Sequence, residues 1–294
     1  MNRPSNQFFL GAACAAAQAR YAVLPVPYEG TVSYMRGTAR APAAILEASA
    51  QVEEFDEELA RDLREAGIIT LPPVPPAGTP EEQMQRVEQA ARAALRDGVF
   101  LLTLGGEHSI TAPLVRAAAA HWGELSVLQI DAHADLRDTY EGSPHSHACV
   151  MRRVLEITDR LAQVGIRNYS QQEYAECRRQ VENLITPTIV ETDPDWIERV
   201  LSLLGEQVYV TVDVDGFDPA CVPGTGTPEP GGLTWRQVTA LLRRVCSERQ
   251  VVAADIVEVA PIAGQVVSEF LAARLAGKII SYVAFCGRGS RKDP

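Results

Sequence analysis

The stretch "VLQIDAHADL" at residues 127–136 decides the expected fold. It begins as an apolar run, and Asp131, His133 and Asp135 then follow at every second position. Alternate side chains of a strand share one face, so two carboxylates and an imidazole meet at the end of a buried strand. Such groups are costly to bury without a partner, and a cation is the obvious one. The alternative is a surface strand with solvated acids, which the preceding apolar run disfavours.

Similar apolar runs recur along the 294-residue chain, separated by turns and amphipathic helices. We predict strands at 21–26, 68–71, 99–104, 125–131, 162–166, 187–190, 207–213, 251–257 and 279–285. The sequence "TPEE" at 79–82, and Thr234 with Gln237, are typical of capping boxes that begin helices, and Asp193-Pro194 predicts another helix start. Apolar strands alternating with helices predict a three-layer α/β/α fold with a doubly wound, mostly parallel sheet of about eight strands.

Composition favours a single domain over residues 1–294 in a reducing compartment. The proline-rich segment 71–80 is too short to separate domains, and the 6 cysteines form no CxxC pair, which is typical of a cytoplasmic protein. The apolar stretch 8–20 resembles a signal peptide, but it runs straight into the predicted strand at 21–26. The net charge of −11 argues against nucleic-acid binding and fits a small cationic substrate. No apolar run is long enough to span a bilayer.

A second candidate ligand follows the strand in "FLLTLGGEHSI" at 100–110. Two glycines after the strand favour a turn, and His108 comes just before a predicted helix. Such a turn could cradle a phosphate, but the Lys and the spacing of a P-loop are absent. Taken alone, His108 could also be an ordinary loop residue.

The third segment is "YVTVDVDGFDPACVPGTGTPEPGG" at 209–232. Asp213 and Asp215 alternate at the end of an apolar strand, and like charges on one face repel unless a cation neutralises them. Asp218 precedes Pro219 and fits a turn residue. In parallel α/β folds, functional sites lie beyond the carboxyl ends of the strands, so the three segments are expected to meet.

Together the strand ends supply two histidines and four aspartates as candidate metal ligands. Four carboxylates balance two divalent ions, with a bridging hydroxide as the remaining charge, and two metals about 3.5–4 Å apart hold such a hydroxide. Imidazole and carboxylate ligands without thiolate suit Mn²⁺ best, with Zn²⁺, Co²⁺, Ni²⁺ or Fe²⁺ as alternatives. The sequence therefore predicts a binuclear centre.

At this point the chain resembles the ureohydrolase family of arginases and agmatinases. "GGEHS", "DAHAD" and "TVDVDGFDPACVPGTGTPEPGG" are similar to three family signatures at full spacing, and the likeness runs from residue 23 to about residue 260. The resemblance implies an arginase-like fold and a two-manganese enzyme that hydrolyses a guanidino group to urea. It also implies a homo-oligomer, a trimer or hexamer by family analogy. The metal ligands it implies are His108, Asp131, His133, Asp135, Asp213 and Asp215.

The resemblance also assigns residues outside the metal centre. His147, in "SHACVMRR", matches the proton-shuttling histidine of the family, and His145 remains a rival for that role. The alternative for His147 is a capping or surface residue near a helix start. Glu258 matches the glutamate that pairs with the substrate guanidinium, since a planar guanidinium suits bidentate carboxylate pairing. Thr227 matches a pocket-wall threonine, whereas His121 belongs to no motif and is expected to be structural.

The substrate expected from the resemblance is agmatine, which would give putrescine and urea in polyamine biosynthesis. "TGTPEPGG" and "DLRDTYEGSPHSHA" resemble the agmatinase branch, and Arg137 stands where arginases usually carry an Asn. An inward Arg137 would favour an acidic substrate tail, whereas pairing with Asp138 or Glu141 would make it a loop clasp. Otherwise Asp138 and Glu141 could attract the amine of the substrate.

Other functions stay open. The same chemistry could act on aminopropyl-agmatine, 4-guanidinobutyrate or arginine. A two-metal phosphoesterase would need more basic residues in the motif loops, and a catalytically silent regulatory subunit is disfavoured by the intact set of ligands.

Overall fold

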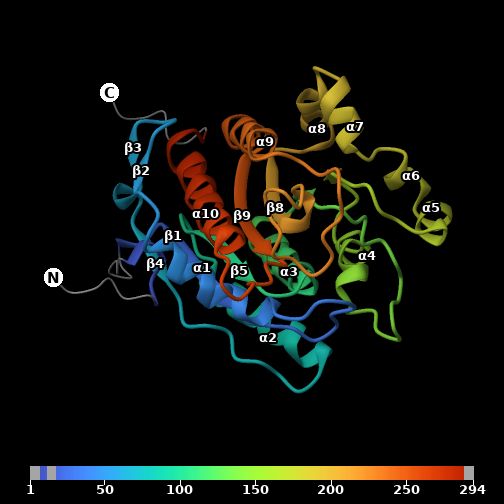
Figure 1. Ribbon diagram of the computed structural model, residues 1–294, viewed down its shortest axis with the longest axis horizontal. Coiled ribbons are helices and arrows are strands. Elements are labelled where there is room, and N and C mark those ends of the chain that lie inside the picture. The colour runs from blue at the N-terminus through green and yellow to red at the C-terminus, as the bar shows by residue number, and fades with distance from the viewer. Residues whose placement is uncertain (1–6, 12–17, 288–294) are drawn as a thin grey trace.

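The structure is a computed structural model that describes residues 7–11 and 18–287, built on a central parallel sheet (Figure 1). The order of its seven strands is β4-β1-β5-β9-β8-β6-β7. They are β1 (Tyr21–Val26), β4 (Ile68–Thr70), β5 (Phe100–Gly105), β6 (Ser126–Ile130), β7 (Leu161–Val164), β8 (Gln207–Asp213) and β9 (Gln250–Val257). Every neighbouring pair is parallel, so all the carboxyl ends lie at one edge.

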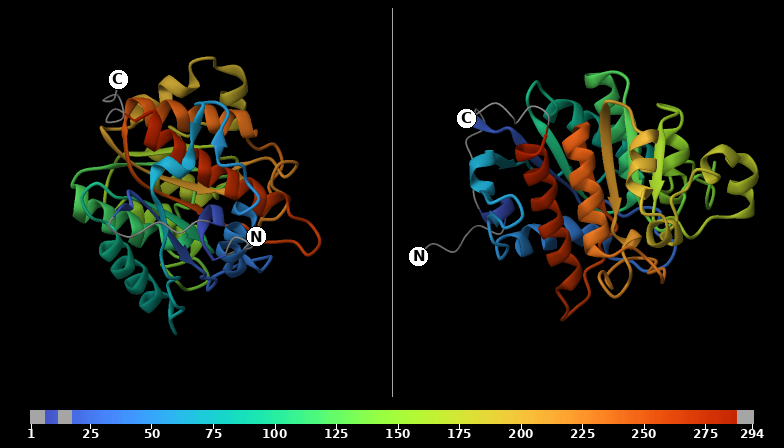
Figure 2. Two further views of the ribbon diagram at one scale, coloured as in Figure 1. Left: turned by 90° about the vertical axis from the view of Figure 1, so that its left-hand side faces the viewer. Right: turned by 90° about the horizontal axis from the view of Figure 1, so that it is seen from above.

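Helices cover both faces of the sheet, which confirms the predicted three-layer α/β/α fold (Figure 2). One layer holds α1 (Ala41–Ser49), α8 (Trp196–Leu203), α9 (Trp235–Glu248) and α10 (Val267–Phe285), and the other holds α2 (Pro80–Ala94), α3 (Thr111–Trp122) and α4 (Val150–Val154). Successive residues of a strand enter opposite layers: Tyr209 belongs to the apolar cluster that includes α3, and Val210 belongs to the one that includes α9. The core is therefore two apolar clusters divided by the sheet.

The predicted helix starts are confirmed. Thr79 and Glu82 form a complete capping box at α2, and Thr234 and Gln237 form one at α9. The helix expected after Asp193-Pro194 is α8. Each cap satisfies backbone N–H groups that have no partner inside the helix.

Two predicted strands are wrong, so the sheet has seven strands rather than about eight among the described residues. Residues 187–190 belong to α7 (Pro187–Thr192), where Thr186 caps the first turn and Pro187 occupies its first position. Residues 279–285 are the end of α10, a helix of 19 residues. Ile279, Ile280 and Tyr282 are all buried there. A helix buried on every side loses its 3.6-residue pattern, so a short piece of it looks like a buried strand.

A second, small sheet was not predicted. β2 (Phe55–Asp56) and β3 (Arg61–Asp62) form a two-stranded antiparallel hairpin that lies beside α10 (Figure 1). Lys278 of α10 donates to Asp56 at 3.0 Å, and both side chains are buried. Two residues per strand are too few to produce a period in the sequence.

The remaining connections are short helices and loops. Between β7 and α8 lie α5 (Gln171–Glu176), α6 (Arg178–Val181) and α7. Segment 71–80 is a largely exposed loop between β4 and α2. None of the helices in the described ranges combines the length and the apolar character needed to cross a bilayer. Residues 12–17 of the signal-like stretch, with Cys14, lie outside the described residues, and the other five cysteines are free thiols.

Candidate metal centre

The polar strand ends meet at the carboxyl edge of the sheet. His108 follows β5, Asp131 and His133 follow β6, and Asp213 ends β8. β6 and β8 are hydrogen-bonded neighbours, with Ile130 paired to Val212. A Cβ atom at Gly216 would lie 2.8 Å from the backbone nitrogen of Asp131, so only a glycine lets these two segments come so close.

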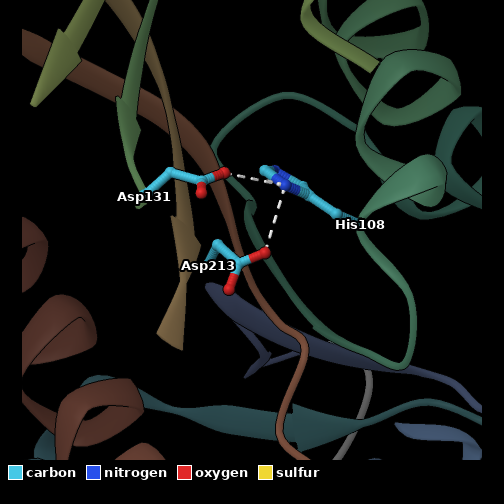
Figure 3. A group of neighbouring side chains, drawn as sticks. All are labelled: His108, Asp131 and Asp213. Carbon is cyan, nitrogen blue, oxygen red and sulfur yellow. Dashed lines mark ion pairs between the residues drawn. The ribbon is translucent and has the colours of Figure 1, made fainter. Parts of the chain in front are cut away.

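Two groups of ligand atoms share one carboxylate. His108 Nδ1 lies 3.1 Å from Asp131 Oδ2, 3.3 Å from Asp213 Oδ2 and 3.1 Å from Asp135 Oδ2. Figure 3 marks the ion pairs of His108 with Asp131 and Asp213 as dashed lines. In the second group, His133 Nδ1 lies 3.0 Å from Asp215 Oδ2 and 3.7 Å from Asp131 Oδ1. The two oxygens of Asp131 therefore face different histidines, as the oxygens of a carboxylate that bridges two cations do.

Hydrogen bonds from backbone N–H groups orient these carboxylates. Asp131 Oδ1 accepts from the backbone N–H of His133 at 2.6 Å, and Asp213 Oδ1 accepts from that of Asp215 at 2.9 Å. Asp215 Oδ1 accepts from the N–H of Ala132 at 3.0 Å, which ties the β8 end to the β6 end. The ligand atoms are thus held in place by the chain itself.

The tautomer of His108 tests whether a cation fits. Its Nε2 lies 3.0 Å from Thr211 Oγ1, and the Thr211 hydroxyl donates to Asp255 at 2.6 Å. Because that proton is already used, Nε2 must be the donor, and in a neutral imidazole Nδ1 then carries a lone pair. This buried Nδ1 has no hydrogen-bond partner and faces three carboxylates. A lone pair among anions is repulsive unless a cation lies between them, so the ligand set fits a metal ion.

Sequence analysis did not single out Thr211 and Asp255. The available signal was an aspartate in the middle of the apolar run 251–257, where a charge is costly to bury without partners. Asp255 is fully buried and accepts from the hydroxyls of Tyr209, Thr111 and Thr211.

The pKa values also point to a demand for positive charge. Burial, together with the negative charge of Asp131, raises the pKa of Asp135 to about 6. Burial and the charges of Asp215 and Asp131 raise the pKa of Asp213 well above its usual value. Burial lowers the pKa of His133, but its bonds to Asp131 and Asp215 outweigh burial and raise that pKa to about 12. Crowded carboxylates favour bound protons at this site, and divalent cations would supply the same positive charge.

Two adjoining cavities lie above these ligands. The inner cavity, about 30 Å³, is also lined by His147, Thr227 and Glu258. The outer cavity, about 160 Å³, shares His147 and Thr227 and adds Arg137 and Tyr140. Thr227 donates to Asp215 Oδ2 at 3.3 Å, so it contacts a ligand as well as the cavity.

Glu258 lies directly after β9 in a strained backbone conformation. Its φ is 65°, in the left-handed region that non-glycine residues seldom adopt, and Asp135 has a φ of 54°. Glu258 Oε1 accepts from the backbone N–H of His108 at 2.6 Å. Burial and the charge of Glu107 raise the pKa of Glu258 well above its usual value. Strained residues of this kind cluster at functional sites, where the surrounding structure holds them.

The three other histidines lie in different surroundings. His147 lines both cavities above the ligands. His145 lines a separate cavity of about 200 Å³ with Met84 and Arg116. His121 is in the last turn of α3, where its ring meets that of Trp122 edge-on at 5.0 Å between centroids. The cavity that holds the ligands therefore contains His147 and not His145 or His121.

Arg137 lines the outer cavity and does not form a clasp with Asp138 or Glu141, one of the two alternatives left open by the sequence. Its guanidinium lies 5.1 Å from the centre of the Tyr140 ring and 3.9 Å from Glu173. Asp138 pairs instead with Arg153 at 2.5 Å, so its charge is already compensated. Glu141 is exposed, lies in a turn with a φ of 49° and lines neither cavity.

The loop after β8 is held by two further side chains. Asp218 accepts from the backbone N–H groups of Ala220, Gly231 and Gly232, as a turn residue does, and it lies outside both ligand groups. Arg167 donates to the carbonyl of Asp215 at 2.8 Å and to that of Glu229 at 2.6 Å. Nothing in the sequence marked Arg167, because its partners are backbone oxygens that are distant along the chain.

Comparison with known proteins identifies the family of the chain. The sequence profile of the arginase family matches residues 19–281. The chain belongs to the arginase family. This arginase-family chain is 42% identical over 274 residues to the N(1)-aminopropylagmatine ureohydrolase of Synechocystis sp., covering 90% of each protein. It is 34% identical to the agmatinase of Bacillus anthracis, covering 88% of this chain and 89% of the relative.

Solved structures show the same fold. The agmatine ureohydrolase of Thermoplasma volcanium superposes with a TM-score of 0.86 at 32% identity, covering 96% of this chain and 94% of that one. The predicted arginase-like fold and family are thereby confirmed.

Proposed function

We propose that the protein is a manganese-dependent ureohydrolase that converts agmatine to putrescine and urea. The observation that carries the proposal is the pair of ligand groups sharing Asp131 beneath a cavity walled by Glu258. Relatives named agmatinase and N(1)-aminopropylagmatine ureohydrolase support the reaction class. The 5 described free thiols and the family analogy extend the proposal to a cytoplasmic homo-oligomer, a trimer or hexamer.

The metal ligands in this proposal are His108, Asp131, His133, Asp135, Asp213 and Asp215. Two divalent cations held there would supply an activated water as the nucleophile. Carboxylate and imidazole ligands without thiolate favour Mn²⁺. His108 Nδ1, with its lone pair toward three carboxylates, supports a cation at this position.

The chain's own residues bind the guanidinium and supply its proton. Glu258 Oε1 is occupied by the N–H of His108, while Oε2 lies near the cavity-lining Gly226. In the proposal this carboxylate pairs with the positive substrate and Thr227 forms the opposite wall. His147 gives a proton to the amine that leaves when the C–N bond breaks, because imidazole exchanges protons near neutral pH.

A second candidate substrate is aminopropyl-agmatine. The Synechocystis and Thermus thermophilus relatives with this name are 42% and 41% identical, against 34% for the Bacillus anthracis agmatinase. The outer cavity of about 160 Å³ adjoins the inner one and gives room for a longer tail. Both candidates share a guanidinium at one end and an amine at the other.

Urea release from a panel of guanidino compounds tests the function. We expect kcat/KM for agmatine or aminopropyl-agmatine to exceed that for arginine by at least about 10²-fold, roughly 3 kcal/mol of transition-state binding. Comparable turnover of arginine or 4-guanidinobutyrate would contradict the amine-tailed substrate. Absence of urea from every compound, with two ions bound, would overturn the ureohydrolase assignment.

The role of His147 has its own test. His147→Asn should lower kcat by about 10²-fold or more while metal content stays normal, because a general acid is lost without loss of a ligand. His145→Asn is the matched control, since His145 lies in a separate cavity, and it should keep kcat within about 2-fold. A larger loss of kcat in the His145 variant would assign the role of proton donor to His145 instead.

A further inference from the structure

A buried carboxylate outside the metal ligands reaches the imidazole of His147 through one hydroxyl. Glu107 is 0% exposed and precedes His108. Its Oε2 accepts from the backbone N–H groups of Gly30 at 2.8 Å and Thr31 at 2.6 Å. Its Oε1 accepts from the hydroxyls of Ser109, at 2.7 Å, and Thr31. Four donors converge on one side chain, so both oxygens of Glu107 act as hydrogen-bond acceptors.

The Thr31 hydroxyl is shared between Glu107 and His147. Its oxygen accepts from the backbone N–H of His147 at 3.2 Å and lies 3.4 Å from His147 Nδ1. A hydroxyl has one proton and two lone pairs, and here the proton goes to Glu107. Toward the imidazole, Thr31 can therefore only accept, so a hydrogen bond between the two needs the imidazole proton on Nδ1.

We propose that Glu107 and Thr31 are positioning residues that hold His147 in the tautomer with its proton on Nδ1. Nε2 is then the nitrogen that exchanges protons with the substrate. The inference deepens the proposed function and rests on it, because it takes His147 as the proton donor to the leaving amine. The direction of the hydrogen bonds, set by the carboxylate, fixes which nitrogen is free.

Replacing Thr31 tests the hydroxyl. Thr31→Val keeps the side-chain shape and the backbone N–H bond to Glu107, and it should lower kcat at least about 10-fold. KM should stay within about 3-fold and metal content at the wild-type value, since no ligand is touched. Thr31→Ser restores the hydroxyl and should recover kcat to within about 3-fold of wild type.

The matched control is Thr38, whose hydroxyl also donates to a carboxylate, that of Glu29 at 3.4 Å. Thr38→Val should keep kcat within about 2-fold, because no histidine depends on that hydrogen bond. Ser146 Oγ lies 3.5 Å from His147 Nδ1, so Ser146→Ala tests the competing hydroxyl. A larger kcat loss in Ser146→Ala than in Thr31→Val would overturn the proposal.

Glu107→Gln should reverse the donor and acceptor roles in the hydrogen bonds that run from residue 107 through the Thr31 hydroxyl to His147. Two backbone N–H groups fix the amide oxygen at the Oε2 position, so the amide nitrogen takes the Oε1 position and faces the two hydroxyls. The Thr31 hydroxyl must then accept from Gln and donate to Nδ1 of His147, which moves the imidazole proton to Nε2. We expect kcat to fall while the ion count is unchanged.

Solid-state ¹⁵N NMR of histidine-labelled protein reads the tautomer without turnover. The protein is loaded with diamagnetic Zn²⁺ and the His147 signals are assigned by comparison with His147→Asn. A protonated Nδ1 in wild type that is lost in Glu107→Gln supports the proposal, and a protonated Nε2 in wild type overturns it. Thr31→Ser as inactive as Thr31→Val would also overturn it. If wild type releases no urea, the proposed function fails, but the NMR result still decides the tautomer.

Discussion

At the scale of single residues, Asp131 differs from the other candidate ligands because both groups use it. Its Oδ2 faces His108 and its Oδ1 faces His133, while Asp213 belongs to one group only. We expect wild type to bind two ions per chain, Asp213→Ala about one and Asp131→Ala almost none, with turnover abolished in both variants. Elemental analysis and urea release measure these outcomes.

An aspartate outside the ligand groups provides the control for this prediction. Asp97 is exposed, lies 3.6 Å from His121, and belongs to neither ligand group nor to the lining of either cavity above them. Asp97→Ala should keep two ions and normal activity. A fully active wild-type preparation with one ion per chain would contradict the binuclear centre.

The second prediction at this scale concerns whether Arg137 contacts the tail of the substrate. Arg137 lines the outer cavity and forms no clasp with Asp138 or Glu141. Stacked on Tyr140 and close to Glu173, its charge is partly compensated. We expect Arg137→Ala to change kcat/KM for agmatine by less than about 3-fold, since an amine tail gains nothing from a guanidinium. If Arg137 instead binds a substrate carboxylate, Arg137→Ala should selectively lower kcat/KM for 4-guanidinobutyrate. Kinetics with both substrates measure this.

At the scale of elements, one buried lysine holds the β2–β3 hairpin on α10. Lys278, with a side chain 4% exposed, lies 3.0 Å from Asp56 and 3.4 Å from Glu58. Lys278→Met leaves the buried Asp56 without its cation, and we expect a loss of about 3 kcal/mol in the free energy of unfolding. Urea denaturation measures it, and activity at 25 °C should be retained because the hairpin is not part of either cavity.

The control on the same hairpin is Arg61, which pairs with Glu65 at 2.8 Å in an exposed setting. Arg61→Ala should cost less than about 1 kcal/mol, because solvent screens an exposed ion pair. Equal losses in the two variants would show that burial of Lys278 does not matter.

The same ion pair gives a pH dependence with a definite sign. Burial raises the pKa of Asp56, but hydrogen bonds from the Lys278 side chain and the Leu59 backbone N–H outweigh it, so the pKa is lowered from 3.8. A carboxyl with a lowered pKa in the folded state contributes its full stability above the unfolded pKa, and this contribution is lost as pH falls through the lower pKa of the folded state. The stability difference between wild type and Asp56→Asn should therefore be full at pH 7 and shrink below about pH 4. Urea denaturation at several pH values measures this difference, and a difference that stays constant would contradict the ion pair.

At the scale of the whole molecule, the candidate metal centre lies where the ends of strands from the middle of the sheet meet. β5, β6, β8 and β9 all send residues into one small cavity, so ions bound there link segments that are distant in sequence. Binding to the folded state alone stabilises it by about 4 kcal/mol when the free ion is at about 1,000 times its dissociation constant. Chelation should lower Tm by on the order of 10 °C for a chain of this length.

Asp131→Asn provides the matched comparison, because it weakens both ion sites and removes one of the crowded charges. Its Tm should respond little to chelator, and calorimetry with and without chelator measures both proteins. An unchanged wild-type Tm after verified metal removal would show that the ions do not hold the strand ends together.

The sequence by itself determined the layers of the fold and the chemistry of the site. Alternation of Asp and His after an apolar run is a local pattern, and it predicts both a buried strand and a shared ligand face. The seven confirmed strands and the two capping boxes are signals of this kind, each complete within a few residues. The prediction failed at 187–190 and 279–285, where a short apolar run fits a buried helix equally well.

Only the tertiary structure decided the relations between distant segments. It placed His147 and His145 in different cavities, gave Arg137 a stacked position instead of a clasp, and brought Thr31 between Glu107 and His147. These contacts join residues up to 116 positions apart, and no periodicity in the sequence encodes them. The physical reason is that a pattern specifies which way a side chain faces, whereas its neighbours are set by the packing of whole strands and helices.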